Sequence, residues 1–245
     1  MFIEFDGIAN VRDLGGIPAA DGKKVRPGRL LRGAALDCAS DADIARLAND
    51  YHLRHVIDLR DEFERQARPN RPVPGAEAHC FGILPEPPHK APSMDTVPDF
   101  DAIFLRVYDK IAHSEISAAS YAKLFRVLLD TPEGAVYFHC AQGKDRTGIA
   151  AILILTALGA DEETAKADYF LSNAGLKDAM AEPGSMGVRP WPKETIEKLF
   201  NVFPEILGVY LDAVKRDWGG LDGYLRGPLG LTDAEFARLR ELYLE

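Results

Sequence analysis

A cysteine and an arginine, Cys140 and Arg146, are separated by five residues in the segment HCAQGKDRTG, residues 139–148. The apolar residues 134–139 predict a strand before them, and the periodic residues 147–158 predict a helix after them. Successive backbone N–H groups at the beginning of a helix can cradle an anion. The spacing therefore predicts a loop that holds a phosphoryl dianion between an ionised sulfur and a guanidinium group.

The side chains of this loop predict nucleophilic chemistry at phosphorus. Positive surroundings lower the pKa of a thiol, so Cys140 is the expected nucleophile. Arg146 offers a planar fork to two phosphoryl oxygens, a geometry that lysine cannot reproduce. Thr147 is expected to hydrogen-bond the sulfur and ease its departure. The predicted reaction forms a cysteinyl-phosphate, which water then hydrolyses, and it needs no metal or other cofactor.

The backbone of the loop is expected to supply further contacts to the substrate. Gly143 tolerates conformations that other residues avoid, which lets the loop curl around an anion. We expect phosphate or sulfate to be able to occupy the same position. The predicted substrate-binding residues are Ala141, Gln142, Gly143, Lys144, Asp145 and Arg146.

Two other kinds of protein use a similar loop. Sulfurtransferases of the rhodanese kind place a cysteine after a strand, but their loops generally lack the KDRTG ending of residues 144–148. A phosphate-binding module without activity is the second alternative, and the joint presence of Cys140, Arg146 and Thr147 argues against it. A phosphatase is favoured, and assays with an aryl phosphate or thiosulfate distinguish the three.

Strands and helices alternate in the first part of the chain, and helices dominate the second part. This order is typical of a largely parallel sheet covered by helices. The proline-rich residues 85–98 predict a loop long enough to be a lid. Strands are predicted at 29–32, 55–59, 76–84 and 134–139, and helices at 40–51, 61–66, 99–111, 117–129, 147–158, 161–172, 193–203, 204–218 and 232–244.

Segments outside the loop follow one another as they do in a known family. The segments are NVRDLGG at 10–16, RPGRLLR at 26–32, VIDLR at 56–60, ADYFLSN at 167–173 and GYLR at 223–226. With the HCxxGKDRTG loop, the chain resembles the bacterial tyrosine-protein phosphatase family of the protein tyrosine phosphatase superfamily. The resemblance implies an α/β fold with a central, mostly parallel sheet flanked by helices. It also implies a single phosphatase domain, residues 1–245, with a helical lid inserted at 85–115.

The resemblance also implies a class of substrate. Members of the family act on phosphotyrosine proteins, in some cases on phosphoserine or phosphothreonine, and on phosphoinositides. Lys144 adds a second cation, as in lipid phosphatases that act on inositol rings, where it would bind a second phosphate or neutralise the first. The expected partner is a phosphoprotein or a phosphoinositide, and the choice between them stays open.

A general acid is needed to protonate the leaving oxygen, and three residues compete for that role. The acid loop usual in tyrosine phosphatases is not evident, because Trp191 and Pro192 are followed by Lys193. In this branch of the family the loop aspartate is a candidate, which favours Asp145. Glu86 and Asp99, near the predicted lid, are the alternatives.

Composition limits the partners and the location. The 29 basic and 38 acidic residues give a net charge of −9, which disfavours nucleic acid as a partner. No apolar run approaches the ~18 residues of a membrane span. Residues 1–6 lack the features of a signal peptide. We expect a cytoplasmic protein without a transmembrane segment, and secretion by a route that needs no such signal stays open.

Polar residues outside the loop are expected to support it. The odd set of three cysteines has no metal-ligand spacing, so no disulfide framework is predicted. Cys80 is expected to be a small buried hydrophobe, and a redox partnership with Cys140 stays open. The predicted supporting residues are Asn10, Arg12 and Asp13 as a brace, Asp58 and Arg60 as an ion pair or as site residues, Arg32 likewise, His139 as an ordering residue, and Asp168 and Asn173 behind the loop.

Overall fold

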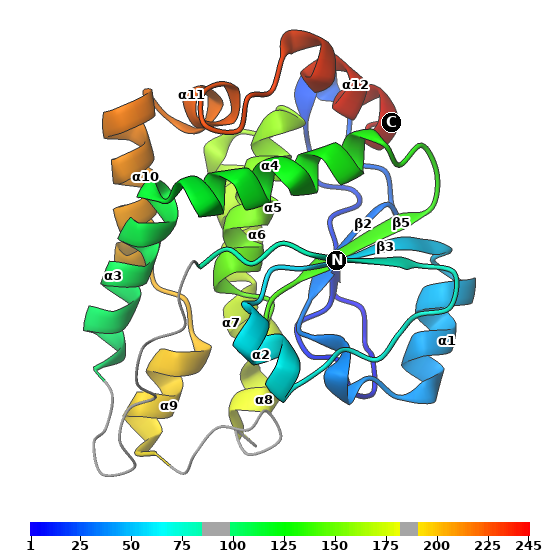
Figure 1. Cartoon of the computed structure of the whole chain (residues 1–245), viewed down its shortest axis with the longest axis vertical. Helices are drawn as coiled ribbons and strands as arrows, with labels where there is room; N and C mark the ends of the chain where they lie inside the picture. Colours follow the sequence, from blue (N-terminus) through cyan, green and yellow to red (C-terminus); the bar gives the residue numbers. More distant parts are fainter. Residues whose placement is uncertain (85–98, 182–190) are drawn as a thin grey trace.

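The computed structural model describes residues 1–84, 99–181 and 191–245 (Figure 1). Within these ranges a five-stranded sheet has the order β1-β2-β5-β3-β4. The edge strand β1 runs antiparallel to β2, and all other neighbours are parallel. The expected α/β fold is therefore confirmed, with one antiparallel edge strand added. The strands are β1 (Arg12–Asp13), β2 (Leu30–Gly33), β3 (Leu53–Asp58), β4 (Glu77–Cys80) and β5 (Ala135–His139).

Helices flank the sheet, and most of them lie on one side of it. Figure 1 shows α1 apart from the large group formed by α4, α5, α6, α10 and α12. The helices are α1 (Asp41–Asn49), α2 (Glu62–Ala67), α3 (Phe100–His113), α4 (Glu115–Leu129), α5 (Asp145–Ala157), α6 (Glu162–Phe170), α7 (Ser172–Gly175), α8 (Lys177–Ala181), α9 (Lys193–Phe200), α10 (Pro204–Trp218), α11 (Leu221–Arg226) and α12 (Asp233–Tyr243).

The central strand β5 is buried on both faces. Val136 and Phe138 join the larger apolar cluster beneath the main group of helices. Ala135 and Tyr137 point the other way, into the smaller cluster that includes α1. Successive side chains of a strand alternate between faces, so β5 reads as a continuous apolar run. Its burial holds the end of the strand firmly in place.

The helix α5 follows the predicted loop and is almost entirely buried. Every residue from 147 to 155 is buried. The helix packs against β2 and β5 and also against α6, α11 and α12. A helix that is apolar all round belongs in the interior, where each side has a partner. The loop is thus anchored at both ends by buried elements.

Several boundaries differ from the predicted ones. The helix expected at 147–158 begins earlier, at Asp145, an acidic residue that suits the positive end of a helix. The helix expected at 161–172 is α6, which ends at Phe170, and the short helix α7 begins at Ser172. The strand expected at 76–84 is limited to β4, and neither β1 nor α11 was anticipated. Ser40 is the N-cap of α1 and forms a capping box with Asp43, which fixes the start of the helix predicted at 40–51.

The predicted lid is only partly described. Residues 85–98, including Glu86, lie outside the described residues. The remainder includes α3, which packs against α4, α9 and α10. The lid therefore stays a prediction. Among the described residues, no helix combines the length and apolarity needed to cross a membrane.

The three cysteines are not joined by a disulfide, and only Cys140 is buried. The expectation that Cys80 is a buried hydrophobe is wrong, because its side chain is exposed. β4 is an edge strand, so it lacks the cover on both faces that buries β5.

Candidate active site

The loop between β5 and α5 lies at the carboxyl end of the central strand. β5 ends at His139 and α5 begins at Asp145, so residues 140–144 make the connection. Cys140 is buried at the start of this connection. The first N–H groups of a helix have no partner within it and favour negative charge. The thiol and the positive end of α5 therefore share one short loop, as predicted.

The loop is bent back by Gly143, whose φ is +68°. A Cβ at this position would lie 2.2 Å from the carbonyl carbon of Gly33. The carbonyl oxygen of Gly143 accepts hydrogen bonds from Arg32 Nη2 at 2.8 Å and Asn10 Nδ2 at 3.1 Å. Asn10 Nδ2 also donates to the carbonyl of Gln142 at 3.1 Å. In a trans peptide the C=O and N–H groups point in opposite directions. These bonds therefore turn the N–H groups of Gly143 and Lys144 away from Asn10 and Arg32.

A buried charged cluster forms this brace behind the loop. Arg12 Nε lies 3.1 Å from Asp168 Oδ1, and Arg32 pairs with the other oxygen of the same carboxylate. Arg12 also donates to Asn10 Oδ1. Burial and the neighbouring Arg32 charge lower the pKa of Arg12 to about 10. Two arginines share one carboxylate, so this region keeps a net positive charge next to the loop.

A second network holds the other side of the loop. His139 Nδ1 lies 2.9 Å from the carbonyl oxygen of Cys140, and His139 Nε2 lies 2.9 Å from Asn70 Nδ2. Asn70 donates in turn to Asp58, which forms a buried ion pair with Arg60. Burial lowers the pKa of His139, which favours the neutral imidazole. His139 thus orders the loop, as expected, and Asp58 and Arg60 form the ion pair rather than facing the loop directly.

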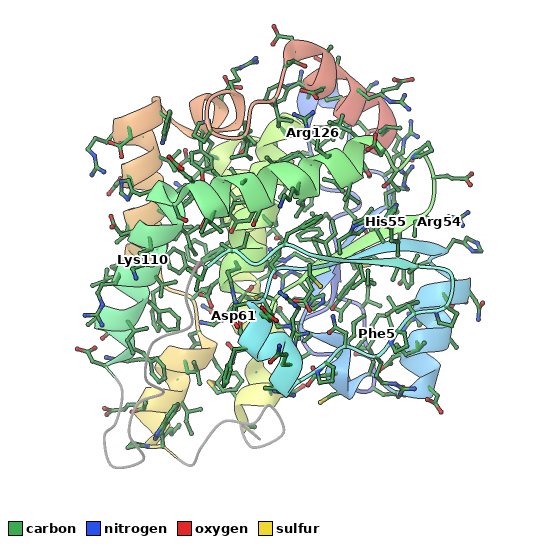
Figure 2. All side chains as sticks on the ribbon, viewed as in Figure 1. Phe5, Arg54, His55, Asp61, Lys110 and Arg126 are labelled. Atoms are coloured by element: carbon green, nitrogen blue, oxygen red, sulfur yellow. The ribbon has the colours of Figure 1, made fainter. Side chains whose placement is uncertain are left out.

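The guanidinium of Arg146 donates two hydrogen bonds to Glu64 of α2. Its Nη1 and Nη2 donate to Glu64 Oε2 and Oε1 at 2.5 and 2.8 Å. Burial alone would raise the pKa of Glu64, but the charge and hydrogen bonds of Arg146 lower it to about 2. Glu64 also closes a capping box with Asp61, which is labelled at the start of α2 in Figure 2. The arginine is therefore held in one orientation by a carboxylate that is itself anchored.

Lys144 and Asp145 lie side by side but differ in exposure. The Lys144 side chain is 1% exposed, and its Nζ donates to the carbonyl of Asn201 at 3.0 Å. The same Nζ lies 4.5 Å from the ring centroid of Phe104 and 3.3 Å from Asp145 Oδ2. Asp145 is 20% exposed, and its Oδ1 accepts a hydrogen bond from Tyr108 at 2.7 Å. The carboxylate is thus oriented from two sides while it still reaches solvent.

Thr147 and Gly148 complete the junction with α5. Among the described residues, the buried hydroxyl of Thr147 has no hydrogen-bond partner, so it can still bond to a sulfur or an oxyanion. A Cβ on Gly148 would lie 2.5 Å from the ring of Tyr169. Tyr121 donates to the carbonyl of Arg146 at 3.1 Å. Close packing around the first turn of α5 therefore depends on a glycine there.

The remaining predicted residues have other contacts. Asp99 is exposed and caps α3 by accepting a hydrogen bond from the N–H of Ala102 at 3.1 Å. Asp13 accepts from the N–H groups of Gly15 and Gly28, so it shapes a turn rather than bracing the loop. Within the described part of the chain, Asn173 bonds to the backbone of Val202 rather than to the loop. Ala141 also lines a cavity of ≈ 970 Å³ together with residues of the N-terminal segment, and the described lining of this cavity includes neither Cys140 nor Arg146.

Glu64, Asn70 and Tyr108 were not predicted from sequence. The DxxE pattern at residues 61–64 is typical of a capping box and indicates that Glu64 lies in the first turn of a helix. Asn70 follows α2 in an irregular stretch, and Tyr108 lies inside α3, where its spacing reads as part of an apolar face. Neither position carries a pattern that points to the loop.

Known proteins match this chain along most of its length. A family model described as the tyrosine phosphatase family matches residues 3–245. A Cupriavidus necator protein named as a tyrosine-protein phosphatase is 33% identical over 260 residues, with 99% of this chain and 88% of that protein covered. The triple specificity protein phosphatase PtpB of Mycobacterium tuberculosis is 28% identical over 280 residues, with 98% of each chain covered.

Among solved structures, P. aeruginosa TpbA has a TM-score of 0.33 at 18% identity, covering 73% of this chain and 89% of that one. PTPMT1 in complex with PI(5)P has a TM-score of 0.31 at 17% identity, covering 77% of this chain and 92% of that one. The family model spans almost every residue, and relatives of similar length match throughout. This chain belongs to the tyrosine phosphatase family and is a phosphatase.

Proposed function

We propose that the chain is a cysteine-dependent phosphomonoester hydrolase that works through a cysteinyl-phosphate. The observation that carries the proposal is the pair of hydrogen bonds from Arg146 to Glu64, because Arg146 lies six residues after Cys140, in the first turn of α5. A guanidinium has five N–H donors, and Glu64 engages two of them. Among the described residues the other donors have no partner, so they can serve phosphoryl oxygens next to the thiol and the positive end of α5.

In the proposed first step, the Cys140 thiolate attacks phosphorus in line with the leaving oxygen. The S–P bond forms as the P–O bond to the alcohol or phenol breaks. Arg146 and the loop N–H groups stabilise the equatorial oxygens as their charge is redistributed. Thr147, whose buried hydroxyl has no partner among the described residues, would hydrogen-bond the sulfur and ease its departure in the second step.

Asp145 is the proposed general acid. It would give its proton to the leaving oxygen, and in the second step it would accept a proton from the water that breaks the S–P bond. Its partial exposure and its position beside Arg146 support this role. Tyr108 and Lys144 each contact one carboxylate oxygen and would keep the group in one orientation. Asp99 and Glu86 are the competing acids.

We propose phosphotyrosine proteins or phosphoinositides as substrates, with phosphoserine and phosphothreonine proteins as further possibilities. The relative named as a triple specificity phosphatase supports a broad range. Lys144 places a second cation close to the loop, although its ammonium group is buried and bonded to Asn201.

The test is the hydrolysis of an aryl phosphate by wild type, Cys140→Ser and Arg146→Lys. We expect Cys140→Ser to abolish turnover, and acid quenching of wild type to trap phosphate on Cys140. A phosphopeptide and a phosphoinositide compared at equal concentration separate the two substrate classes. Full activity in Cys140→Ser would overturn the proposal, and turnover of thiosulfate alone would favour a sulfurtransferase.

A further inference from the structure

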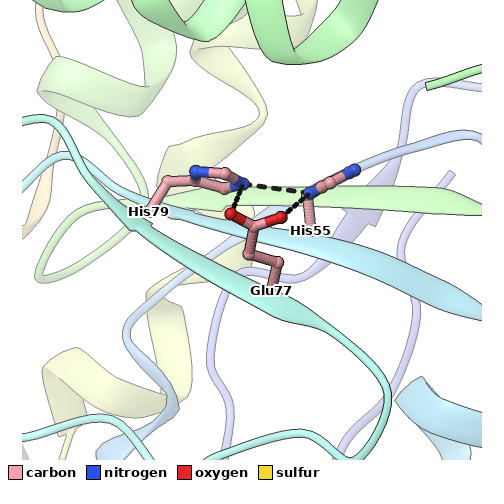
Figure 3. Close-up of side chains that lie close together, drawn as sticks. All are labelled: His55, Glu77 and His79. Atoms are coloured by element: carbon pink, nitrogen blue, oxygen red, sulfur yellow. Dashed lines mark hydrogen bonds and ion pairs between the residues drawn. The ribbon is translucent and has the colours of Figure 1, made fainter. Parts of the chain in front are cut away.

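Two histidines and a glutamate meet on one face of the sheet, away from the loop. In the parallel register of β3 and β4, His55 pairs with Glu77 and Ile57 pairs with His79. Because side chains alternate along a strand, His55, Glu77 and His79 all lie on the same face. Figure 3 shows the three side chains converging, with the carboxylate opposite both imidazole rings.

The ligand atoms of these residues lie within 4.8 Å of one another. His55 Nδ1 is 2.9 Å from His79 Nε2. Glu77 Oε2 is 4.0 Å from His55 Nδ1, and Glu77 Oε1 is 3.9 Å from His79 Nε2. Neighbouring ligands on a metal with bonds near 2.1 Å lie about 3.0–3.4 Å apart. The nitrogens are close to that separation, and the exposed Glu77 side chain has room to approach.

We propose that His55, Glu77 and His79 bind one divalent transition-metal ion, with Zn²⁺ as its representative. Two imidazole nitrogens and one carboxylate oxygen suit zinc and its neighbours, whereas calcium and magnesium prefer oxygen ligands. Three protein ligands leave at least one position for water. The ring of His79 also packs near Phe81, with centroids 5.5 Å apart, which limits its motion before the metal binds.

The proposed metal site is separate from the catalytic loop. His55 precedes Asp58 by three residues of β3, which corresponds to about 10 Å along a strand. Figure 2 labels His55 and Asp61 at well-separated positions along this part of the chain. The ion would join the edge strand β4 to its neighbour β3. We therefore expect it to slow the opening of β4, without taking part in hydrolysis.

The binding test uses a chain in which Cys38, Cys80 and Cys140 are all replaced by serine, so that no thiol competes for zinc. Titration calorimetry with Zn²⁺ should give one ion per chain. We expect His79→Gln and Glu77→Gln to weaken that binding by at least tenfold. The matched control is His52→Asn, which removes a nearby exposed histidine and suits its positive φ of 48°.

A second measurement separates binding at this site from loss of fold. In the chain with the three cysteines replaced by serine, hydrogen exchange of the β4 amides should slow when Zn²⁺ is added. When Glu77→Gln is added to that chain, Zn²⁺ should leave the exchange rate unchanged. Circular dichroism checks the fold of each variant, and Glu77 is 69% exposed, so its replacement leaves the core intact. The proposal would be overturned if Zn²⁺ did not bind one-to-one. It would also be overturned if His52→Asn weakened Zn²⁺ binding as much as His79→Gln does.

Discussion

At the scale of single residues, Arg146 depends on Glu64 for its orientation. The carboxylate accepts hydrogen bonds from the two terminal nitrogens of the guanidinium, and among the described residues the other N–H donors of Arg146 have no further partner. Such an arrangement fixes the group before substrate arrives. A displacement of about 1 Å in a positioning group can cost about 100-fold in rate. The effect of this contact on catalysis can therefore be measured apart from the effect of the arginine itself.

We predict that Glu64→Gln lowers kcat/KM for an aryl phosphate by about 10–100-fold, because the neutral amide loosens Arg146. Steady-state kinetics on the purified variant checks this. Glu62→Gln is the matched control, since Glu62 lies on the same helix but is exposed and bonded to Gln66. Equal kcat/KM values for Glu64→Gln and wild type would show that catalysis does not depend on the Glu64–Arg146 ion pair.

The role of Asp145 can be separated from that of its rivals by leaving-group dependence. We predict that Asp145→Asn lowers turnover strongly for an alkyl phosphate and mildly for a nitrophenyl phosphate, because a good leaving group needs little protonation. Asp99→Asn serves as the comparison, since asparagine caps a helix as well as aspartate does. The same loss on both substrates in Asp145→Asn would instead indicate an architectural role.

At the scale of elements, the loop is shaped by the junction of β5, α5 and the strand β2 behind it. Gly143 has a positive φ and lies against Gly33 at the end of β2. Gly208, inside α10, is a contrasting glycine, because a Cβ there would meet nothing within 4 Å. The two positions allow the cost of a methyl group in the loop to be compared with its ordinary effect in a helix.

We predict that Gly143→Ala destabilises the chain by about 1–3 kcal/mol and abolishes most activity, since alanine is strained at this φ and would clash with Gly33. Gly208→Ala should instead stabilise by about 0.5–1 kcal/mol and leave activity unchanged. Urea unfolding and aryl phosphate turnover of both variants provide the measurements. Normal activity in Gly143→Ala would contradict the close fit of the loop.

At the scale of the whole molecule, ionised carboxylates contribute to stability in a defined pH range. The pKa of Glu64 is lowered to about 2 from an ordinary value of 4.5, because Arg146 outweighs the opposing effect of burial. A lowered pKa means that the unfolded chain binds the proton first as pH falls. The contribution is therefore complete above about pH 5 and is lost as pH falls towards 2.

We predict that wild type exceeds Glu64→Gln in unfolding free energy by about 2–3 kcal/mol at pH 7, and that the difference shrinks steadily below pH 4.5. Urea unfolding of both proteins at pH 7, 4 and 3 measures it. The unfolding free energy of Glu62→Gln should change with pH in the same way as that of wild type. A gap that stayed constant with pH would show that the Glu64 charge is not its source.

The loop could be predicted from sequence because its parts are contiguous. Cys140, Gly143 and Arg146 lie within one strand-to-helix turn, and a local pattern is enough to identify them. The residues that orient the loop come from elsewhere. Glu64 is 82 residues from Arg146 and Asn70 is 69 residues from His139. No periodicity or spacing in one sequence encodes such pairs, because tertiary packing creates them.

The order of the sheet has a consequence for synthesis on the ribosome. β2 and β3 both pair with β5, which lies between them but is made about 80–100 residues later, so two edges wait unpaired while the chain grows. Arg12 and Arg32 stay without their carboxylate partner for longer, because Asp168 is synthesised after β5. A nascent chain interrupted before that point would retain two unneutralised guanidinium groups and an open sheet, the features that chaperones and proteases recognise.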